Sequence, residues 1–418
     1  MKTVLGNGVT VIASRRPATR AVSVGIWVRG GSAADPAGLS GIAHFCEHMA
    51  FKATKKRSAA ALSEAFDAMG GCVNAYTAKL HTCYYCKTLE KHLAQALSLL
   101  AEMLLEPAYE EKEVETERKV ILEEIAMVED SPDDLVNARL CEGVWRGSVL
   151  GREILGTAES VSRIGSQELR ASAERMVVGK NLVVVAAGCL DEAAFSEDCR
   201  RLFGKIRAGE RAADLENGSS ERVALYQKKE IEQLHLCLGF PSYPMFDERR
   251  YALSVLSLLT GGTMSSRLFR AVREEAGLAY QVQSYLSPYL HTGLFCVYAA
   301  LSPDRLCECL SLLKGELEKI RESGFSEEEI RRAKDQLISA TILDGEGPEA
   351  AMKLLAKNAL YEKGERELDA VLERIEAVRG EEVFALSREL FDPARLSISL
   401  VGPFDGDVLR LREEIFGA

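Results

Sequence analysis

The sequence predicts an α+β protein with two homologous sandwich domains, each a mainly antiparallel sheet with packed helices. Three observations lead to this fold class. The chain has 418 residues, which exceeds a single hydrophobic core and suits two domains of about 200 residues each. Short segments of strand-like composition alternate with longer segments of helical periodicity. One pattern of residues also occurs twice, about half a chain apart.

The repeat is clearest around two Leu-His-Thr triplets, whose histidines are His81 and His291. These two histidines lie 210 residues apart in the chain of 418 residues. Each triplet precedes a strand-like segment and then a helical one, so we expect two copies of one fold. The paired segments are 83–88 with 294–300, and 92–105 with 304–320.

The domain boundaries follow from the repeat. Residues 1–207 form the expected N-terminal domain, and residues 223–418 form the C-terminal one. Residues 208–222 are rich in charged residues, serine and glycine, which is typical of a linker. The second copy has the apolar segment 251–259 where the first copy has the histidine-containing segment 42–51. We therefore expect only the N-terminal domain to be catalytic.

Stretches rich in valine, leucine and isoleucine predict the strands, since such side chains suit a pleated and buried surface. Three of these stretches lie in the first half of the chain and two in the second. They cover residues 9–14, 21–29, 182–188, 231–239 and 396–401.

Segment 42–51 carries the most informative motif, which reads His44-Phe-Cys-Glu47-His48. On a helix, residues four apart lie on one face, so both imidazoles can point at one ion. Zn²⁺ suits two imidazoles, and an open coordination position lowers the pKa of a bound water to about 7. Glu47 can then take the proton of the zinc-bound water and return it to a leaving amine. The order His-x-x-Glu-His is the inverzincin motif, although such a helix could also pack its histidines against a partly polar core.

A hydrolytic zinc normally has three protein ligands, so a further ligand is expected on another segment. Residues 110–130 combine strong helix formers with an apolar stripe, which predicts a helix. This segment contains many glutamates, most of which must form a solvated face. Spacing alone does not choose the third ligand among them.

A resemblance to a known family bears on this choice. Glu117-Arg118 followed by Val-Ile-Leu-Glu-Glu-Ile at 120–125 resembles the distal segment of the pitrilysin, or insulinase, family of zinc metallopeptidases. The similarity is strongest to its short bacterial processing-peptidase-like members and to the β subunit of the mitochondrial processing peptidase. In that family the third zinc ligand is a glutamate roughly 76 residues after the second histidine. Glu124 lies 76 residues after His48.

The resemblance implies a complete site and a fold. It implies that His44, His48 and Glu124 bind one Zn²⁺ per chain and that Glu47 is the general base. Glu117, two helical turns before Glu124, corresponds to a supporting or auxiliary catalytic acid. The fold implied is a tandem repeat of the LuxS/metallopeptidase-like type.

Residues Asn74-Ala75-Tyr76 are similar to the family's substrate-binding edge strand. There an extended peptide adds itself to the sheet through backbone hydrogen bonds. Periodicity alone favours an ordinary half-buried strand leading into residues 83–86.

Segment 261–280 resembles the part of the second half that contacts the bound peptide, with Arg273 and Tyr280 at the family's spacing of seven. An arginine offers planar donors to a peptide carbonyl, and a tyrosine hydroxyl can stabilise an oxyanion. Without the family, a surface arginine on a helix and a core tyrosine at a strand start would be the simpler interpretation.

Composition excludes some functions. The 63 acidic and 52 basic residues give a net charge of −11, which argues against nonspecific nucleic-acid binding. The longest apolar run, 182–190, is about half a membrane span, so we expect no membrane insertion. The first residues lead directly into a predicted strand and the eleven cysteines are scattered, so we expect a cytoplasmic protein with reduced thiols.

We therefore expect a zinc metalloendopeptidase that hydrolyses peptides or unfolded protein segments inside a closed chamber. The longest family members contain four such domains and this chain contains two, so a homodimer is the simplest way to complete the chamber. One alternative is a non-catalytic or partner-dependent processing-peptidase subunit, although an intact His-x-x-Glu-His motif argues against it. Another is a hydrolase of nonpeptide amides, which the same zinc chemistry would permit.

Overall fold

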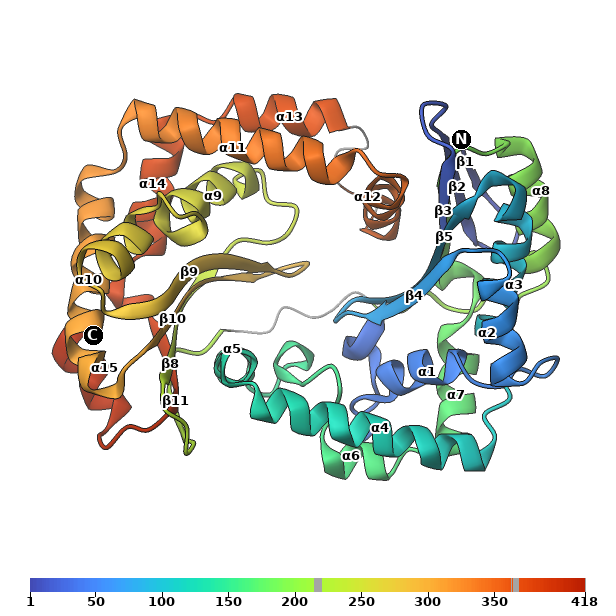
Figure 1. The fold of residues 1–418 in the computed structure, drawn as a ribbon, viewed down its shortest axis with the longest axis horizontal. Helices are drawn as coiled ribbons and strands as arrows, with labels where there is room; N and C mark the ends of the chain where they lie inside the picture. The colour runs from blue at the N-terminus through green and yellow to red at the C-terminus, as the bar shows by residue number, and fades with distance from the viewer. Residues whose placement is uncertain (214–219, 362, 364–367, 418) are drawn as a thin grey trace. The chain divides into compact units, whose positions relative to one another are not determined.

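The computed structural model of the protein describes residues 1–213, 220–361, 363 and 368–417 (Figure 1). The expected linker, 208–222, lies partly outside the described residues. Contacts divide the chain into two compact units, and each unit takes segments from both halves of the sequence. Unit 1 comprises Met1–Ala126, Arg152–Asp214 and Asp344–Arg366, and unit 2 comprises Met127–Gly151, Leu215–Leu343 and Glu367–Ala418.

Unit 1 is built on a six-stranded sheet with the order β1-β2-β6-β3-β5-β4. Only the pair β2 and β6 is parallel, so the sheet is mainly antiparallel, as predicted. Strand β4 lies at one edge, because within the described chain it pairs only with β5. The strands are β1 (Lys2–Val4), β2 (Thr10–Arg15), β3 (Ala21–Arg29), β4 (Cys72–Thr77), β5 (His81–Leu89) and β6 (Leu182–Gly188).

Unit 2 contains a five-stranded sheet with the order β7-β11-β8-β10-β9. This order corresponds strand by strand to β2-β6-β3-β5-β4, and the pair β7 and β11 is again the parallel one. The repeat seen in the sequence is therefore confirmed as two copies of one topology. The strands are β7 (Ala224–Lys228), β8 (Leu234–Ser242), β9 (Ala279–Pro288), β10 (Gly293–Leu301) and β11 (Ser397–Gly402).

Helices cover both faces of the unit 1 sheet. On one face, α3 (Leu93–Leu105) and α8 (Glu192–Phe203) pack against alternate strand residues such as Val24 and Val184. On the other face, α12 (Pro348–Tyr361) contacts β2, β3 and β6 (Figure 1). Because both faces are covered, every residue of β6 is buried. The other helices of this unit are α1 (Ile42–Ala50), α2 (Ala59–Asp67), α6 (Ala158–Ser162) and α7 (Ser166–Met176).

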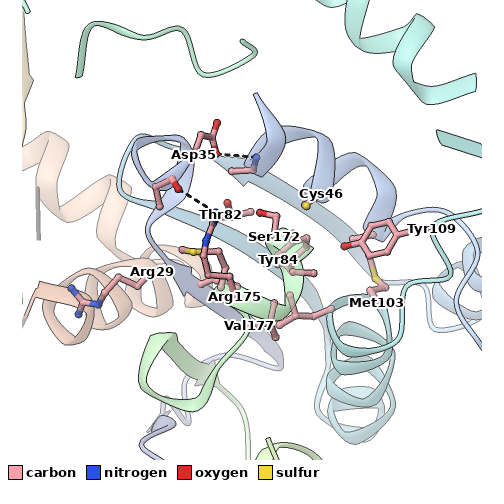
Figure 2. Close-up of a pocket in the computed structure, with 18 residues that line it drawn as sticks. Arg29, Asp35, Cys46, Thr82, Tyr84, Met103, Tyr109, Ser172, Arg175 and Val177 are labelled. Atoms are coloured by element: carbon pink, nitrogen blue, oxygen red, sulfur yellow. Dashed lines mark hydrogen bonds between the residues drawn. The ribbon is translucent and has the colours of Figure 1, made fainter. Parts of the chain in front are cut away.

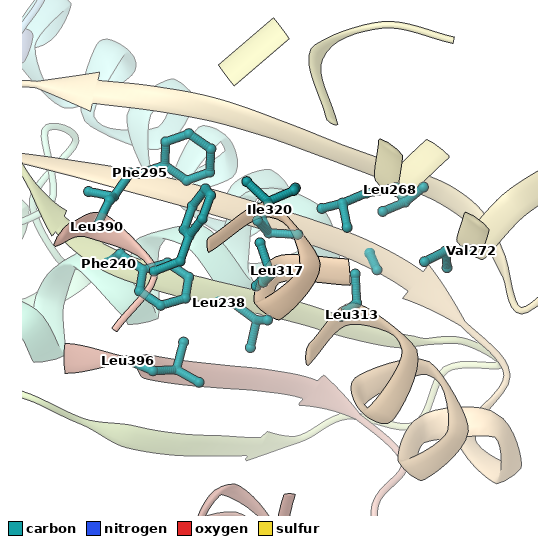
Figure 3. Close-up of a cluster of buried hydrophobic side chains, with 14 of the residues drawn as sticks. Leu238, Phe240, Leu268, Val272, Phe295, Leu313, Leu317, Ile320, Leu390 and Leu396 are labelled. Atoms are coloured by element: carbon teal, nitrogen blue, oxygen red, sulfur yellow. The ribbon is translucent and has the colours of Figure 1, made fainter. Parts of the chain in front are cut away.

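The unit 2 sheet is covered in the same way. Helix α5 (Pro132–Val144) packs on β8 and β11, and the larger core lies on the opposite face. Figure 3 shows this larger core, where the rings of Phe240 and Phe295 lie near Leu390 and Leu317. The helices of that side and its surroundings are α9 (Arg250–Ser257), α10 (Leu306–Ser323), α11 (Glu327–Gly345), α13 (Leu368–Glu376), α14 (Gly380–Leu390) and α15 (Val408–Phe416).

The long helix α4 (Glu111–Asp130) starts in unit 1 and ends in unit 2. None of the helices in the described residues is long and apolar enough to cross a membrane. All eleven cysteines lie in the described part of the chain and are free. The architecture is thus an α+β fold with two similar sheets, as the sequence predicted.

Candidate metal centre

Helix α1 holds the His-x-x-Glu-His motif and is fixed through its apolar side. Ile42, Phe45 and Met49 are at most 1% exposed and pack with apolar residues of α4 and α7. Ile121 and Ile125 of α4 belong to the same apolar cluster. The i, i+3, i+7 spacing of the α1 residues places them on one side of the helix. Packing of this side therefore fixes the direction in which the histidines point.

The side chains of His44, His48 and Glu124 converge on one point. The Nε2 atoms of the two histidines lie 3.2 Å apart. Oε2 of Glu124 lies 3.4 Å from Nε2 of His48 and 3.7 Å from Nε2 of His44. A tetrahedral zinc with ligand bonds of about 2.1 Å separates its ligand atoms by about 3.4 Å. Two imidazoles and one carboxylate at these distances fit Zn²⁺.

The protonation of the two histidines suits a cation site. Burial lowers the pKa of His44 to about 4, with a smaller contribution from His48, so its imidazole is neutral at neutral pH. Burial also lowers the pKa of His48, but the hydrogen bond to Glu117 and the nearby carboxylates outweigh it and raise the pKa overall. A neutral His44 offers a lone pair to a cation, and the carboxylates that raise the pKa of His48 favour positive charge beside that ring.

Glu117 supports the centre through His48. Nδ1–H of His48 donates to Oε1 of Glu117 over 2.9 Å, which leaves Nε2 directed at Glu124. The second carboxylate oxygen of Glu117 lies 2.5 Å from Nζ of Lys52. Burial raises the pKa of Glu117, but the hydrogen bonds from His48 and Lys52 outweigh burial and lower it. Glu117 is therefore an anion that orients His48.

Glu47 is buried on the same helix, at 9% exposure. Its Oε2 accepts a hydrogen bond of 2.5 Å from Oγ1 of Thr77. Burial raises the pKa of Glu47, and this outweighs the opposite effects of Thr77 and His48. A carboxylate whose pKa is raised takes up a proton more readily, which suits a general base.

The neighbouring glutamates of α4 point in different directions. Glu123 is exposed, whereas Glu124 turns toward the histidines with 37% of its side chain exposed. Adjacent residues of a helix differ by about 100° around its axis, which explains the contrast. Glu117, seven residues before Glu124, lies on the same side of α4 as Glu124.

Asn74, Ala75 and Tyr76 lie on the edge strand β4. The side chain of Asn74 is exposed, and the Tyr76 hydroxyl lies 3.4 Å from Nε2 of His81. The strand belongs to the same unit as His44, His48 and Glu124, and α1 packs against it.

Arg273 and Tyr280 belong to unit 2. Arg273 lies in the π-helical segment Phe269–Glu275, and its guanidinium lies 5.5 Å from the centroid of the Tyr280 ring. Tyr280 is the second residue of β9 and is 74% exposed, so it is not a core residue.

A cavity of about 50 Å³ lies beside α1, and His44, His48 and Glu124 do not line it. Figure 2 shows Asp35 at the start of the helix, with Cys46, Tyr84 and Tyr109 around the cavity. The carboxylate of Asp35 accepts hydrogen bonds from the backbone N–H groups of Gly41 and Ala43, at 2.7 and 3.1 Å. Asp35 thus satisfies N–H groups at the helix start, where the N-cap residue is Gly41 and has no side chain to offer.

Three residues that support the site carry no motif in the sequence. Lys52 lies one helical turn beyond His48, and that spacing is the only sequence signal for its pairing with Glu117. Asp35 and Thr77 reach the site from a loop and from a strand, so their roles depend on the tertiary fold.

The chain matches two parts of one family. Residues 10–158 match the family described as Insulinase (Peptidase family M16), and residues 163–337 match the one described as Peptidase M16 inactive domain. An uncharacterized zinc protease of Bacillus subtilis is 36% identical over 95% of this chain and 97% of its own length. An uncharacterized zinc protease of Streptomyces coelicolor is 37% identical over 99% of this chain and 92% of its own length.

Solved structures share the fold. A protease from Helicobacter pylori has a TM-score of 0.88 at 20% identity and covers 96% of this chain and 99% of its own. A peptidase M16 inactive domain from Pseudomonas fluorescens has a TM-score of 0.89 at 18% identity and covers 97% of this chain and 98% of its own. At such low identity these similarities concern the fold alone.

Proposed function

Because the chain belongs to the insulinase family of peptidases, family M16, we propose that it is a zinc-dependent endopeptidase acting on peptides or unfolded protein segments. The observation that carries the proposal is the convergence of two imidazoles and one carboxylate within ligand distance of a single point. Relatives named as zinc proteases, similar along nearly the whole chain, support the same activity.

In this proposal His44, His48 and Glu124 hold one Zn²⁺ per chain. When bound, Zn²⁺ would supply Lewis acidity, which would polarise a peptide carbonyl and lower the pKa of water enough for a base to deprotonate it at neutral pH. Glu47 takes up the water's proton at the carboxylate oxygen that is free of hydrogen bonds and returns it to the leaving amine. Glu117 keeps His48 in the tautomer whose Nε2 lone pair would be available to the ion.

The substrate lies along β4 in an extended conformation. An edge strand offers unpaired backbone groups, and a peptide can pair with those of Asn74, Ala75 and Tyr76 as an added strand. Arg273 and Tyr280 supply further contacts from unit 2, where the tyrosine hydroxyl is accessible.

Two such chains form a homodimer that encloses the substrate in a chamber. Each chain carries both the metal-binding segment and the segment of Arg273 and Tyr280, so identical subunits provide every part. We place the protein in the cytoplasm, which is supported by eleven free cysteines, because reducing compartments keep thiols unpaired.

Replacement of the base tests the mechanism. Glu47→Gln should keep zinc and lower peptide hydrolysis by about 100- to 10,000-fold, because an amide cannot take up the proton. His44→Ala should lose the metal as well as the activity. Cut sites in a mixed peptide library, read by mass spectrometry with and without a chelator, provide the measurement, and zinc content is determined on the same samples.

Glu123→Gln is the matched control, since it removes an exposed carboxylate next to the ligand Glu124. This variant should retain zinc and activity. Full turnover by Glu47→Gln would remove the proposed mechanism, and wild-type protein that carries zinc but cuts no peptide would remove the proposed function.

A further inference from the structure

Thr77, the last residue of β4, is the only described residue that donates a hydrogen bond to the carboxylate of Glu47. The distance from Oγ1 of Thr77 to Oε2 of Glu47 is 2.5 Å. Such a short distance is typical of a hydroxyl bound to an ionised carboxylate. Thr77 lies three residues beyond Asn74 on the same edge strand, and its hydroxyl contacts helix α1.

The direction of this hydrogen bond is fixed by chemistry. An ionised carboxylate only accepts hydrogen bonds, so Thr77 must use its single hydroxyl proton on Glu47. The hydroxyl of Thr82 lies 3.3 Å from that of Thr77, and Thr82 must therefore be the donor between them. The two threonines form a chain of donors, from Thr82 through Thr77 to Glu47.

The strand makes Thr77 a rigid support. Thr77 and Thr82 are directly paired residues of the antiparallel strands β4 and β5. A threonine has a short side chain with few rotamers, so the ladder fixes the position of its hydroxyl. Thr82 is only 6% exposed, which shields this end of the chain from water. The hydrogen bond thus holds one oxygen of Glu47 and leaves the other free.

We propose that Thr77 is a positioning residue, which holds the Glu47 carboxylate so that its second oxygen receives the proton during peptide hydrolysis. The inference rests on the proposed function, because it assigns a task to Glu47. The inference goes beyond the proposed function, because it assigns a role in catalysis to strand β4 as well as to helix α1. If Thr77 only stabilised the pairing of β4 with β5, its hydroxyl would need no hydrogen bond to Glu47 of α1.

Thr77→Val tests the proposal, because valine keeps the shape and removes the hydroxyl. We expect kcat to fall roughly ten- to a hundredfold, as for the loss of a hydrogen bond to a charged group. KM for the peptide and the zinc content should stay within about twofold of the wild-type values. The melting temperature should stay within a few degrees of that of the wild type. Thr77→Ser should restore most of the activity, since serine keeps the donor.

Thr88→Val is the matched control. Thr88 is a buried threonine of β5 whose hydroxyl has no hydrogen-bond partner among the described residues. The same chemical change there should leave kcat unchanged. A fall in activity with Thr77→Val that Thr77→Ser does not reverse would assign Thr77 to packing and overturn the proposal.

A double variant separates this inference from the proposed function. In a Glu47→Gln background, Thr77→Val should cause no further loss of the residual rate, because the group that it positions is already gone. An equal loss in both backgrounds would show that Thr77 acts without Glu47. Wild-type protein that hydrolyses peptides while Thr77→Val is equally active would refute the role of Thr77 and leave the proposed function intact.

Discussion

The two histidines of the candidate metal centre are held in different ways. Nδ1 of His48 donates to Glu117, whose other oxygen pairs with Lys52, so a buried carboxylate in a partly exposed ion pair fixes this ring. Nδ1 of His44 is buried, and no residue of the described chain bonds to it. The direction of His44 therefore depends on the packing of α1, whereas that of His48 depends on electrostatics.

This difference leads to a prediction for Glu117→Gln. The amide keeps the shape but loses the charge that orients His48 and balances Lys52. We expect zinc affinity to fall about 10- to 100-fold, as is usual when a partner of a metal-binding histidine is replaced. Competition with a chromophoric chelator measures it.

Glu123→Gln again serves as the control, because it changes an exposed glutamate of the same helix. We expect Glu123→Gln to bind zinc as tightly as the wild type. If Glu117→Gln also bound zinc as tightly as the wild type, that result would contradict a role for Glu117 in zinc binding.

The sequence predicted part of the candidate site. The spacing of His44, Glu47 and His48 is local, and one helix face is enough to bring them together. Glu124 needed the family, because periodicity treats all glutamates of an exposed helix alike. Thr77 could not be predicted, since its contact with Glu47 joins a strand and a helix that are thirty residues apart in sequence.

At the scale of elements, the start of α1 depends on Asp35. Burial raises the pKa of this carboxyl to about 7, although the N–H groups of Gly41 and Ala43 and the charges of Arg175 and Arg152 lower it. In the unfolded chain an aspartate titrates near pH 3.9. Between about pH 4 and pH 7 the unfolded state thus loses a proton that the folded state retains. The contribution of Asp35 to stability is present below about pH 4 and is lost as the pH rises to about 7.

Asp35→Asn removes this titration. The stability of the wild type relative to Asp35→Asn should fall as the pH rises from 5 to 7, by up to about 1.4 kcal/mol per pH unit, and change little above pH 8. Denaturation is followed in metal-free protein with Trp145 replaced by phenylalanine, so that Trp27 reports on unit 1 alone.

Asp67→Asn, at an exposed aspartate of α2, provides the comparison and should show no such trend. A difference between wild type and Asp35→Asn that is independent of pH would contradict the prediction.

Element types were more predictable than their ends. Strands β3 and β6 have the predicted limits, because both are runs of mainly apolar residues ended by arginine or glycine. The strand expected at 231–239 instead covers Leu234–Ser242. The N–H groups of Lys229 and Ile231 bond to the carbonyls of Gly402 and Lys229, whereas pairing with β10 begins at Leu234 and extends to Ser242. Tertiary pairing, which composition does not encode, sets these limits.

At the scale of the whole molecule, the repeat predicted the topology but not the membership of every helix. We propose that residues 1–207 and 223–418 are the two copies of the repeat, one catalytic and one not. Helices α5 and α12 follow the long helices α4 and α11 at corresponding places, and each packs on the sheet of the other copy. Periodicity gives the apolar faces of α5 and α12 but does not state which sheet they cover.

The proposed homodimer can be tested by measuring the mass of the protein in solution together with its activity. Sedimentation velocity at the concentration used for activity should show a species of twice the chain mass in the wild type. Dilution below the dissociation constant should lower the specific activity, because a single chain cannot close the chamber. A monomer with full specific activity would contradict the dimer.

The exchange of α5 and α12 has a consequence for synthesis of the protein. A ribosome releases β6 about 160 residues before α12, so one side of the first sheet emerges without its cover. Trp27 and Val185 would face water, or a chaperone, until most of the chain has been translated. The metal-binding half therefore cannot finish folding first, even though it is made first. Maturation of the centre is delayed until the nascent chain is almost complete.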